Sequence, residues 1–333
     1  LRLPPFARDH FRFLFLAKHA LSDGSPDRED GTHATYHREL LDTLRGIGLN
    51  VEAANSFDAL LTRPDVNFVI SVLNRAGFLN SEMLAPLLSQ YYDIPFLGGT
   101  PIVRGVSDDK HLMKRIAQAL GVRTPDWQHL PRGGFLFIEP TDRNAEAFIV
   151  KPNASSASWG IKVTGTWQET LEHSQLLHAA GHDAIVESWI DGYDLAVPVI
   201  GSITPWYLPV VRYDYDGSLR SYEQKRDLVS GREGHEVLEP SRLTSEVLRL
   251  SDLLLREIWP IDHGRIEFRV DASSGEIHFI EVNLNCNLWS RKTIAVAARH
   301  VGLTHTELVE TIICHSLHRQ SLLDVQQVPE RAA

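Results

Sequence analysis

Four polar side chains between positions 264 and 283 are spaced as metal and phosphate chemistry would require. Apolar and polar residues alternate on both sides of a short turn, which predicts a two-stranded hairpin. In that register Glu267 lies opposite Glu281. Arg265 lies opposite Asn283 on the same face. Carboxylates that face each other in a sheet repel, so we expect a cation between them. Carboxylate and amide oxygens suit magnesium that is shared with phosphate oxygens.

The other face of this hairpin is apolar and would hold the polar face in place. Its members are Ile266, Phe268, Val270, Ile280 and Val282. Phe279 departs from the pattern, because it falls on the polar face. The alternative is an exposed hairpin whose acids are solvated and whose Arg265 pairs with one of them. These residues alone leave both interpretations open.

A lysine followed by small residues is a candidate for phosphate binding. Lys151 ends an apolar strand, and the loop at 153–160 that follows is rich in Ser and Ala. Small residues let backbone N–H groups approach a phosphate, and the lysine adds a positive charge. Lys110, at the start of a predicted helix, is a second candidate. Taken alone, these features are explained more simply by a hairpin loop and a surface lysine.

Residues 186–194 could recognise a nucleoside. The segment ends a strand and offers backbone edges, an aromatic ring at Trp189, and the carboxylates of Glu187 and Asp194. Such a hinge can bind an adenine edge and a ribose diol. On its own it is only a polar turn.

Strands that alternate with helices must position these side chains. Strands are predicted at 11–17, 51–54 and 67–73 with helices between them, as in a parallel sheet with crossover helices. This region carries no GxGxxG motif, which argues against a nicotinamide site. A helix predicted at 107–120 begins the next unit.

The rest of the chain predicts two α+β units. The first has strands at 147–152, 161–164 and 184–188 and a helix at 168–179. The second has a strand-rich stretch at 195–215, a polar mobile loop at 221–239, a helix at 241–258, the hairpin, and two helices that end near position 317. We therefore expect domains at 1–106, 107–194 and 195–325.

Composition excludes several classes of protein. With 333 residues, 43% of them apolar, the chain is long enough for two or three globular domains. Its net charge of -10 and scattered basic residues argue against nucleic-acid or anionic-membrane partners. No apolar stretch reaches the roughly 20 residues of a membrane span, and the start lacks a signal-peptide pattern, so we expect a cytoplasmic protein. Cys286 and Cys314 are too few for a disulfide framework.

Taken together and in this order, these segments resemble the D-alanine:D-alanine ligase branch of the ATP-grasp superfamily across nearly the whole chain. The matching stretches are DKHLMK at 109–114, LGVRTP at 120–125, FIVKP at 148–152, VESW at 186–189, YEQK at 222–225, GRIE at 264–267 and IEVN at 280–283. The resemblance implies an α/β fold of ATP-grasp type. An N-terminal parallel-sheet domain would precede central and C-terminal α+β domains that enclose ATP.

The resemblance also implies roles for individual residues. Nucleotide contacts would come from Lys110, Lys151, Ser155, Ser156, Ser158, Glu187, Trp189, Asp194 and Lys225. Two magnesium ions, with manganese as an alternative, would be held by Glu267, Glu281 and Asn283. Phosphoryl transfer and the later tetrahedral centre would be assisted by Arg265, Lys225 and Asn287.

The resemblance fails where the family binds its amino acids. Ala157 and Arg226 replace a serine and a tyrosine of the family's dipeptide ligases, and Lys292 replaces a serine. The histidine-containing segment of the first domain and the glycine-rich turn are also replaced, at 73–77 and 284–287. We therefore expect a substrate pocket at Ala157, Arg226 and Lys292 that does not make D-alanyl-D-alanine. The two cations indicate a more anionic substrate, unless they point to solvent, which the sequence leaves equally open.

The predicted activity is ATP-dependent ligation of a carboxylate to an amine through an acyl phosphate, giving an amino-acid or dipeptide-like amide. Two alternatives stay open: an intramolecular ring closure in specialised metabolism, and a non-catalytic nucleotide-binding regulatory protein. Partners would be small molecules and, by the resemblance, a second copy of the chain. His33 and His37 lack a third ligand at metal spacing, and Cys286 lacks an activating histidine, so we expect no chemistry from them.

Overall fold

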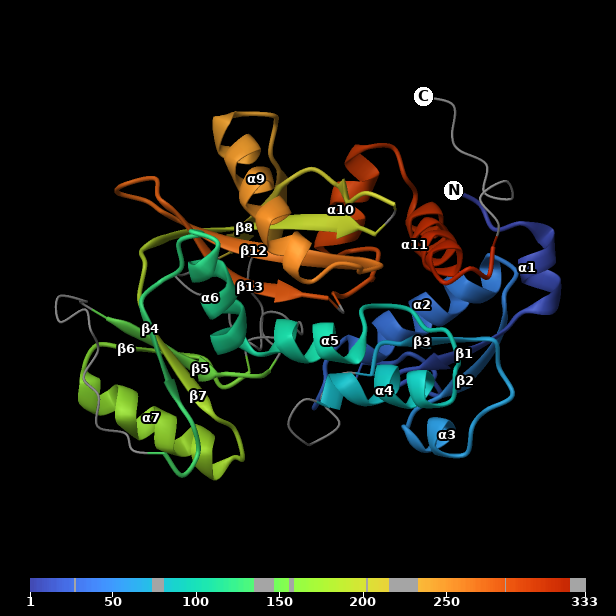
Figure 1. Cartoon of the computed structure of the whole chain (residues 1–333), viewed down its shortest axis with the longest axis horizontal. Coiled ribbons are helices and arrows are strands. Elements are labelled where there is room, and N and C mark those ends of the chain that lie inside the picture. The colour runs from blue at the N-terminus through green and yellow to red at the C-terminus, as the bar shows by residue number, and fades with distance from the viewer. Residues whose placement is uncertain are drawn as a thin grey trace.

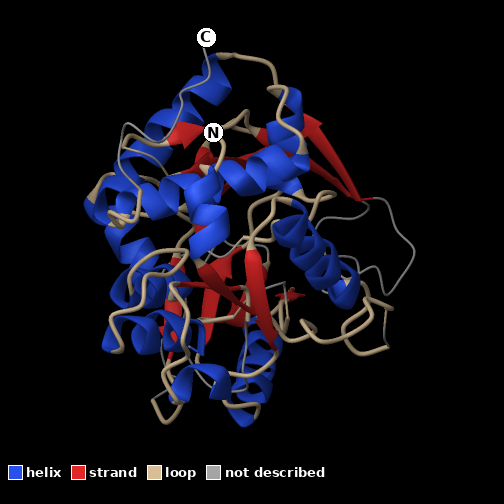
Figure 2. Ribbon diagram, turned by 90° about the vertical axis from the view of Figure 1, so that its right-hand side faces the viewer, coloured by secondary structure: helices blue, strands red, loops and turns tan. Residues whose placement is uncertain are grey.

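The computed structural model describes residues 1–26, 28–73, 81–134, 147–155, 159–201, 203–215, 233–284 and 286–323 of the chain. Within these residues there are three β-sheets (Figures 1 and 2). In Figure 1 the N-terminal sheet lies at the right, a four-stranded sheet at the lower left and a six-stranded sheet above it. Helices α5 and α6 run through the middle of the view, between the three sheets.

The first sheet is parallel, as the sequence predicted. β1 (Arg12–Leu16) is its central strand, with β2 (Asn50–Ala54) and β3 (Phe68–Ser71) on either side. β1 is buried on both faces from Phe13 onward, as expected for a parallel strand that helices cover. The helices of this part are α1 (Pro5–His10), α2 (His33–Gly46), α3 (Asp58–Leu61), the 3-10 helix η1 (Ser81–Met83) and α4 (Leu84–Tyr91).

A short helix that the sequence did not predict precedes the helix predicted at 107–120. α5 (Pro101–Asp108) ends before Asp109, and α6 (Lys110–Ala119) begins directly after it. Asp109 has an extended backbone, and its side chain accepts a hydrogen bond from the Leu112 N–H at 2.9 Å. The helix predicted at 107–120 is confirmed as α6, which begins three residues later than predicted because Asp109 caps it.

The second sheet is antiparallel, in the order β4-β7-β5-β6. Its strands are β4 (Trp127–Leu130), β5 (Phe148–Pro152), β6 (Lys162–Thr164) and β7 (Ala184–Ser188). α7 (Trp167–Ala179) packs on β5, β6 and β7, and its first turn is capped by the hydroxyl of Thr166. The strands and the helix predicted for 147–188 are confirmed.

The third sheet has the order β11-β10-β8-β12-β13, with β9 paired to β8. Its strands are β8 (Gly192–Ile200), β9 (Trp206–Tyr207), β10 (Val211–Tyr215), β11 (Glu233–Val237), β12 (His263–Asp271) and β13 (Ile277–Asn283). Its helices are α9 (Arg242–Glu257), α10 (Thr293–His300) and α11 (His305–Arg319). A Cβ at Gly192 would lie 1.9 Å from Val270 O, so only glycine fits where β8 enters this sheet.

The loop predicted at 221–239 ends earlier than expected. Residues 216–232 lie outside the described part of the chain, but β11 pairs antiparallel with β10 along its whole length. The ring of His235 also packs edge-on against Tyr213, with centroids 5.6 Å apart. The prediction of a loop was wrong for 233–237, because main-chain pairing with β10 outweighs the polar composition.

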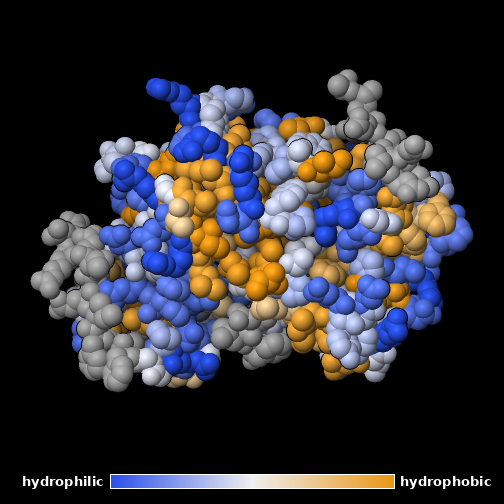
Figure 3. All heavy atoms as spheres, viewed as in Figure 1, coloured by the Kyte–Doolittle hydropathy of each residue, from blue (hydrophilic) through white to orange (hydrophobic). Residues whose placement is uncertain are grey.

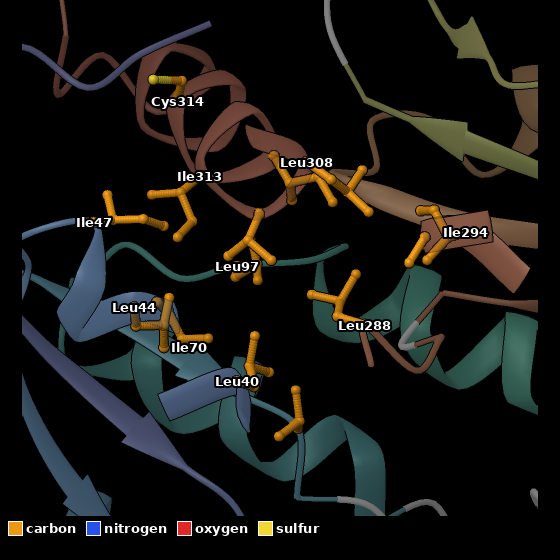
Figure 4. Packing of buried hydrophobic residues seen from close by; sticks show 14 of the residues in the cluster. Leu40, Leu44, Ile47, Ile70, Leu97, Leu288, Ile294, Leu308, Ile313 and Cys314 are labelled. Atoms are coloured by element: carbon orange, nitrogen blue, oxygen red, sulfur yellow. The ribbon is translucent and has the colours of Figure 1, made fainter. Parts of the chain in front are cut away.

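Residues far apart in the sequence form the core between the first sheet and the last helices. The side chains that converge there (Figure 4) include Leu40, Ile70, Leu97, Leu288 and Ile313. Cys286 and Cys314 are buried in the same cluster as free thiols. On the face shown in Figure 3, hydrophobic residues gather near the centre and hydrophilic residues surround them. None of the described helices is both long and apolar enough to cross a membrane.

Candidate active site

A pocket of about 780 Å3, part of it open to solvent, lies between the second and third sheets. Its apolar lining includes Pro125, Ile149, Ile161, Phe268 and Ile280. Its polar and aromatic lining includes Lys151, Glu187, Ser188, Trp189, Asp194, Tyr213, Glu267, Arg269 and Glu281. The structure thus brings six of the residues singled out in the sequence into one cavity: Lys151, Glu187, Trp189, Asp194, Glu267 and Glu281.

One carboxylate in the wall of this pocket is shared by two lysines. Lys151 Nζ lies 2.7 Å from Glu187 Oε1, and Lys114 Nζ lies 3.2 Å from the same oxygen. All three side chains are at most 4% exposed. Burial alone would raise the pKa of Glu187, but the two ammonium groups lower it. Burial lowers the pKa of Lys114 to about 8, although Glu187 opposes this shift.

The start of α6 is joined to the small-residue loop that follows β5. The Lys110 N–H donates to Asn153 O at 3.1 Å, and the His111 N–H donates to Asn153 Oδ1 at 2.9 Å. Lys110 Nζ donates to Ser155 O at 2.9 Å and lies 3.4 Å from Glu281 Oε2. Burial alone would lower the pKa of Lys110, but nearby carboxylates, chiefly Glu281, raise it. The two lysines predicted to bind phosphate therefore approach the pocket from different elements.

The hairpin has the register that the sequence predicted. Arg265 pairs with Asn283, and Glu267 pairs with Glu281. Arg265 Nε donates to Glu267 Oε1 at 2.9 Å, and Asn283 Nδ2 donates to Glu281 Oε1 at 3.2 Å. Glu267 is therefore paired with Arg265 on the same strand, and Glu281 is paired with Lys110 of α6 and accepts a hydrogen bond from Asn283.

A β-bulge corrects one detail of that prediction. Phe268 pairs with Phe279, which leaves Ile280 as the extra residue in β13. Phe279 is fully buried in the core, whereas Ile280 lines the pocket. The predicted positions of Phe279 and Ile280 were wrong, because the bulge turns the aromatic ring inward and the isoleucine outward.

The segment at 186–194 is held by an arginine from β12. Arg269 Nε donates to Ile190 O and its Nη1 donates to Asp194 Oδ1, both at 2.7 Å. The guanidinium also lies 4.5 Å from the centroid of the Trp189 ring. The predicted ribose acid and the predicted aromatic contact are thus fixed by one residue that the sequence analysis did not single out.

Residues 116–314, more than half of the chain, match the family model described as D-ala D-ala ligase C-terminus. The chain belongs to this ligase family. It is 29% identical over 226 residues to the D-alanine--D-alanine ligase of Aquifex aeolicus (strain VF5), covering 68% of this chain and 75% of the relative. It is 26% identical over 296 residues to that of Xanthomonas axonopodis pv. citri, covering 84% and 88%.

Solved structures agree on the fold. A D-alanine--D-alanine ligase from Bacillus anthracis complexed with ATP superposes with a TM-score of 0.75 at 18% identity, covering 94% of this chain and 99% of that one. The VanG D-Ala:D-Ser ligase from Enterococcus faecalis gives a TM-score of 0.71 at 14% identity, covering 92% and 99%. The ATP-grasp fold predicted from the sequence is confirmed, and the chain is an ATP-grasp ligase of the C–N bond-forming class.

A magnesium ion fits the donors that this ligase presents on its hairpin. Glu267, Glu281 and Asn283 offer hard oxygens on one face, which are the donors that magnesium prefers. Within the described ranges, no group of three or more His, Cys, Asp and Glu could hold a metal by itself. Bound water and phosphate oxygens would complete the coordination.

The loop between β13 and α10 contacts the N-terminal part of the ligase. The Leu288 N–H donates to the Tyr36 hydroxyl at 3.2 Å, and Trp289 Nε1 donates to Glu39 Oε2 at 2.9 Å. Asn287 Oδ1 accepts from the Trp289 N–H at 2.8 Å, so this side chain shapes the loop. Lys292 is the N-cap residue of α10, and its Nζ lies 5.9 Å from the centroid of the Trp289 ring. Neither Asn287 nor Lys292 lines the pocket described above.

Three residues of the site were not singled out from the sequence. Lys114 and Arg269 are described above. Tyr213 donates to Glu267 Oε1 at 3.3 Å, and its oxygen lies 3.1 Å from Thr293 Oγ1 at the start of α10. Arg269 could have been found, because it alternates with Arg265 and Glu267 on one strand. Tyr213 and Lys114 carry no such signal.

Several predicted residues lie outside the described part of the chain. They are Ser156, Ala157, Ser158, Lys225, Arg226, most of segment 73–77, and Asn285 within the turn at 284–287. Of the predicted loop serines, Ser155 is described, and its carbonyl oxygen accepts from Lys110. Cys286 is 3% exposed, and burial raises its pKa to about 11, which keeps it a protonated thiol.

Proposed function

We propose that the chain is an ATP-dependent ligase that activates a carboxylate as an acyl phosphate and joins it to an amine, with a product other than D-alanyl-D-alanine. The observation that carries this proposal is the pairing of Glu267 with Glu281 at the end of a pocket that also holds Lys151 and Glu187. A nucleotide base would lie against the apolar lining near Trp189. Its phosphates would point toward Lys110, Lys151 and the two glutamates.

Each group in the pocket has a task in this proposal. Lys110 and Lys151 neutralise phosphate oxygens, and Asp194 takes ribose hydroxyls. Glu267, Glu281 and Asn283 would hold magnesium, which supplies charge neutralisation at the transferring phosphoryl group. Arg265, directed by Glu267, stabilises negative charge on the transferring phosphoryl group and later on the tetrahedral centre. Catalysis is then mainly positioning and electrostatics.

The loop between β13 and α10, where we expect the substrates to bind, supports a product that differs from that of the relatives. The loop with Asn287 and Lys292 is held to α2 by Tyr36, Trp289 and Glu39, through the hydrogen bonds given above. Lys292 at the start of α10 adds a positive charge next to this loop, which suits a substrate with additional negative charge. Arg226 and Ala157 stay predicted substrate-binding residues outside the described part of the chain.

The division into three domains also stays a proposal. The three separate sheets support it. The expected boundary between positions 194 and 195 falls inside β8, the strand that leads from the second sheet into the third.

ADP release measured over pooled L- and D-amino acids, with mass spectrometry of each positive pool, tests the proposal. We expect a condensed product and stoichiometric ADP in at least one pool, and no dipeptide from D-alanine alone. Intramolecular ring closure would instead give ADP with a product of one substrate minus water. If the protein binds ATP but forms no ADP in any pool, this would contradict the ligase proposal and favour a regulatory role.

A pair of variants controls this assay. Glu281→Gln removes one proposed metal ligand and should lower ADP release about 100-fold or more. Glu276→Gln lies just before the same strand and removes an exposed carboxylate that pairs with Arg123 at 3.0 Å. It should leave the rate unchanged. Equal rates for both variants would show that the hairpin carboxylates take no part in turnover.

A further inference from the structure

Lys114 and Lys151 share one carboxylate oxygen but differ in everything else that they contact. Lys114 is fully buried on α6, and its Nζ donates to Thr124 Oγ1 at 2.7 Å as well as lying 3.2 Å from Glu187 Oε1. Lys151 lies closer to that oxygen, at 2.7 Å, and lines the pocket. Lys114 does not line it. Lys151 is therefore part of the pocket lining, whereas Lys114 lies behind that lining.

The charges of this group decide what Lys151 is able to do. Two ammonium groups and one carboxylate are buried together, so the group keeps one positive charge in excess. A buried carboxylate without a counterion is strongly disfavoured. If Lys151 alone neutralised Glu187, moving its ammonium group to a phosphate would leave such a carboxylate behind. The attraction to the phosphate would then be largely cancelled.

We propose that Lys114 is the permanent counterion of Glu187 and thereby allows the ammonium group of Lys151 to move from Glu187 to a phosphate of the bound nucleotide. Lys114 is a positioning residue in this proposal, because it acts through Glu187 and touches no ligand. The inference rests on the proposed function, since it takes the pocket to be the nucleotide site.

The position of Lys114 on α6 supports this assignment. Lys114 follows Lys110 by four residues, so both lie on the same buried face of the helix. The Thr124 hydroxyl holds the ammonium group from the other side. Both lysines lower the pKa of Glu187 against the effect of burial, so the carboxylate stays charged and needs a counterion at all times.

The test compares the affinities of the purified full chain for ATP and for adenosine, measured by calorimetry. The ratio of the two affinities isolates the contribution of the phosphates. In Lys114→Met, Glu187 retains Lys151, and we expect the preference for ATP over adenosine to fall about tenfold or more. Adenosine binding should change little, because adenosine has no phosphate for Lys151 to reach.

A second substitution should reverse the effect. In Lys114→Met/Glu187→Gln no carboxylate remains to retain Lys151, so the preference for ATP should return to near the wild-type value. Glu187→Gln alone should keep at least the wild-type preference. Any contact between Glu187 and the base cancels in the ratio. The matched control is Lys162→Met, which removes an exposed lysine of β6 and should have no effect.

The outcomes separate this inference from the proposed function. A wild-type protein that binds adenosine as tightly as ATP would overturn both. A wild-type preference for ATP that Lys114→Met leaves intact, or that the double variant does not restore, would overturn only the role of Lys114. If Lys114→Met does not fold, Glu187→Gln decides the question, because a reduced preference in that variant contradicts the proposal.

Discussion

Arg269 links the backbone, the aromatic ring and the carboxylate of the segment at 186–194. It donates to Ile190 O and Asp194 Oδ1 and covers the ring of Trp189. The carboxylate that we propose for ribose binding therefore has one oxygen held in place before a nucleotide arrives. Preorganisation of this kind improves binding because less freedom is lost when the ligand binds.

Replacing Arg269 should weaken ribose recognition more than base recognition. Arg269→Met keeps the length of the side chain but leaves Asp194 without its donor at 2.7 Å. We expect the Kd for ATP to rise about tenfold and the Kd for 2′,3′-dideoxy-ATP to rise much less. Arg212→Met is the control, because Arg212 is exposed and covers the neighbouring Tyr193 ring at 4.4 Å. An equal loss for both nucleotides would argue against a ribose role for Asp194.

His263 at the start of β12 makes stability depend on pH. It is 1% exposed. Burial lowers its pKa to about 4 from 6.5. Between these values the unfolded chain binds a proton that the folded chain does not, so stability falls as the pH falls, by ~1.4 kcal/mol per pKa unit. His263→Gln should flatten the pH dependence of urea unfolding between about pH 7 and pH 4.5. Identical slopes would contradict this.

The sequence predicted the residues that line the pocket better than those that support them. Lys151, Glu187 and Glu281 stand at strand ends or in alternating positions, where residue type and spacing carry the information. Lys114 looks like any helix lysine, and only its complete burial distinguishes it. Burial depends on tertiary packing, which local spacing does not encode.

The hairpin also shows what local residue spacing can predict and what it cannot. The alternating pattern was sufficient to predict that Glu267 faces Glu281, but not that β13 bulges at the next residue. An aromatic side chain gains more from burial than an isoleucine gains from staying inside, and both cannot face the core. The bulge resolves this conflict and also places Ile280 in the lining of the pocket.

Substitutions on either side of the bulge should separate stability from binding. Phe279→Ala empties a fully buried site and should lower the free energy of unfolding by about 3–5 kcal/mol. Ile280→Ala should cost less than about 1.5 kcal/mol, because its side chain faces the pocket, while raising the Kd for ATP. Urea denaturation and ATP calorimetry on both variants measure this. Larger destabilisation by Ile280→Ala than by Phe279→Ala would contradict the bulge.

At the scale of the whole molecule, Asp262 joins three distant segments. Its carboxylate accepts from the Gly98 N–H and the Ser316 hydroxyl, both at 2.6 Å, and from Arg319 Nε at 2.8 Å. Arg319 also donates to Gly98 O at 3.1 Å. The end of the first sheet, the start of β12 and the last helix are thus held at one point. The sequence could not predict this, because the residues are more than 50 positions apart.

Removing this carboxylate should destabilise all three segments together. In Asp262→Asn the side chain keeps its shape, but the guanidinium of Arg319 loses its counterion at a site where Asp262 is 1% exposed. Breaking a buried ion pair costs about 3–5 kcal/mol, so we expect a clear fall in Tm while unfolding stays a single transition. The control is Glu246→Gln on α9, whose partner Arg249 is 58% exposed and whose loss should cost less than about 1 kcal/mol.

Equal shifts in Tm would show that Asp262 contributes no more than a surface charge. A separate early transition would show that the first sheet unfolds independently of the last helix.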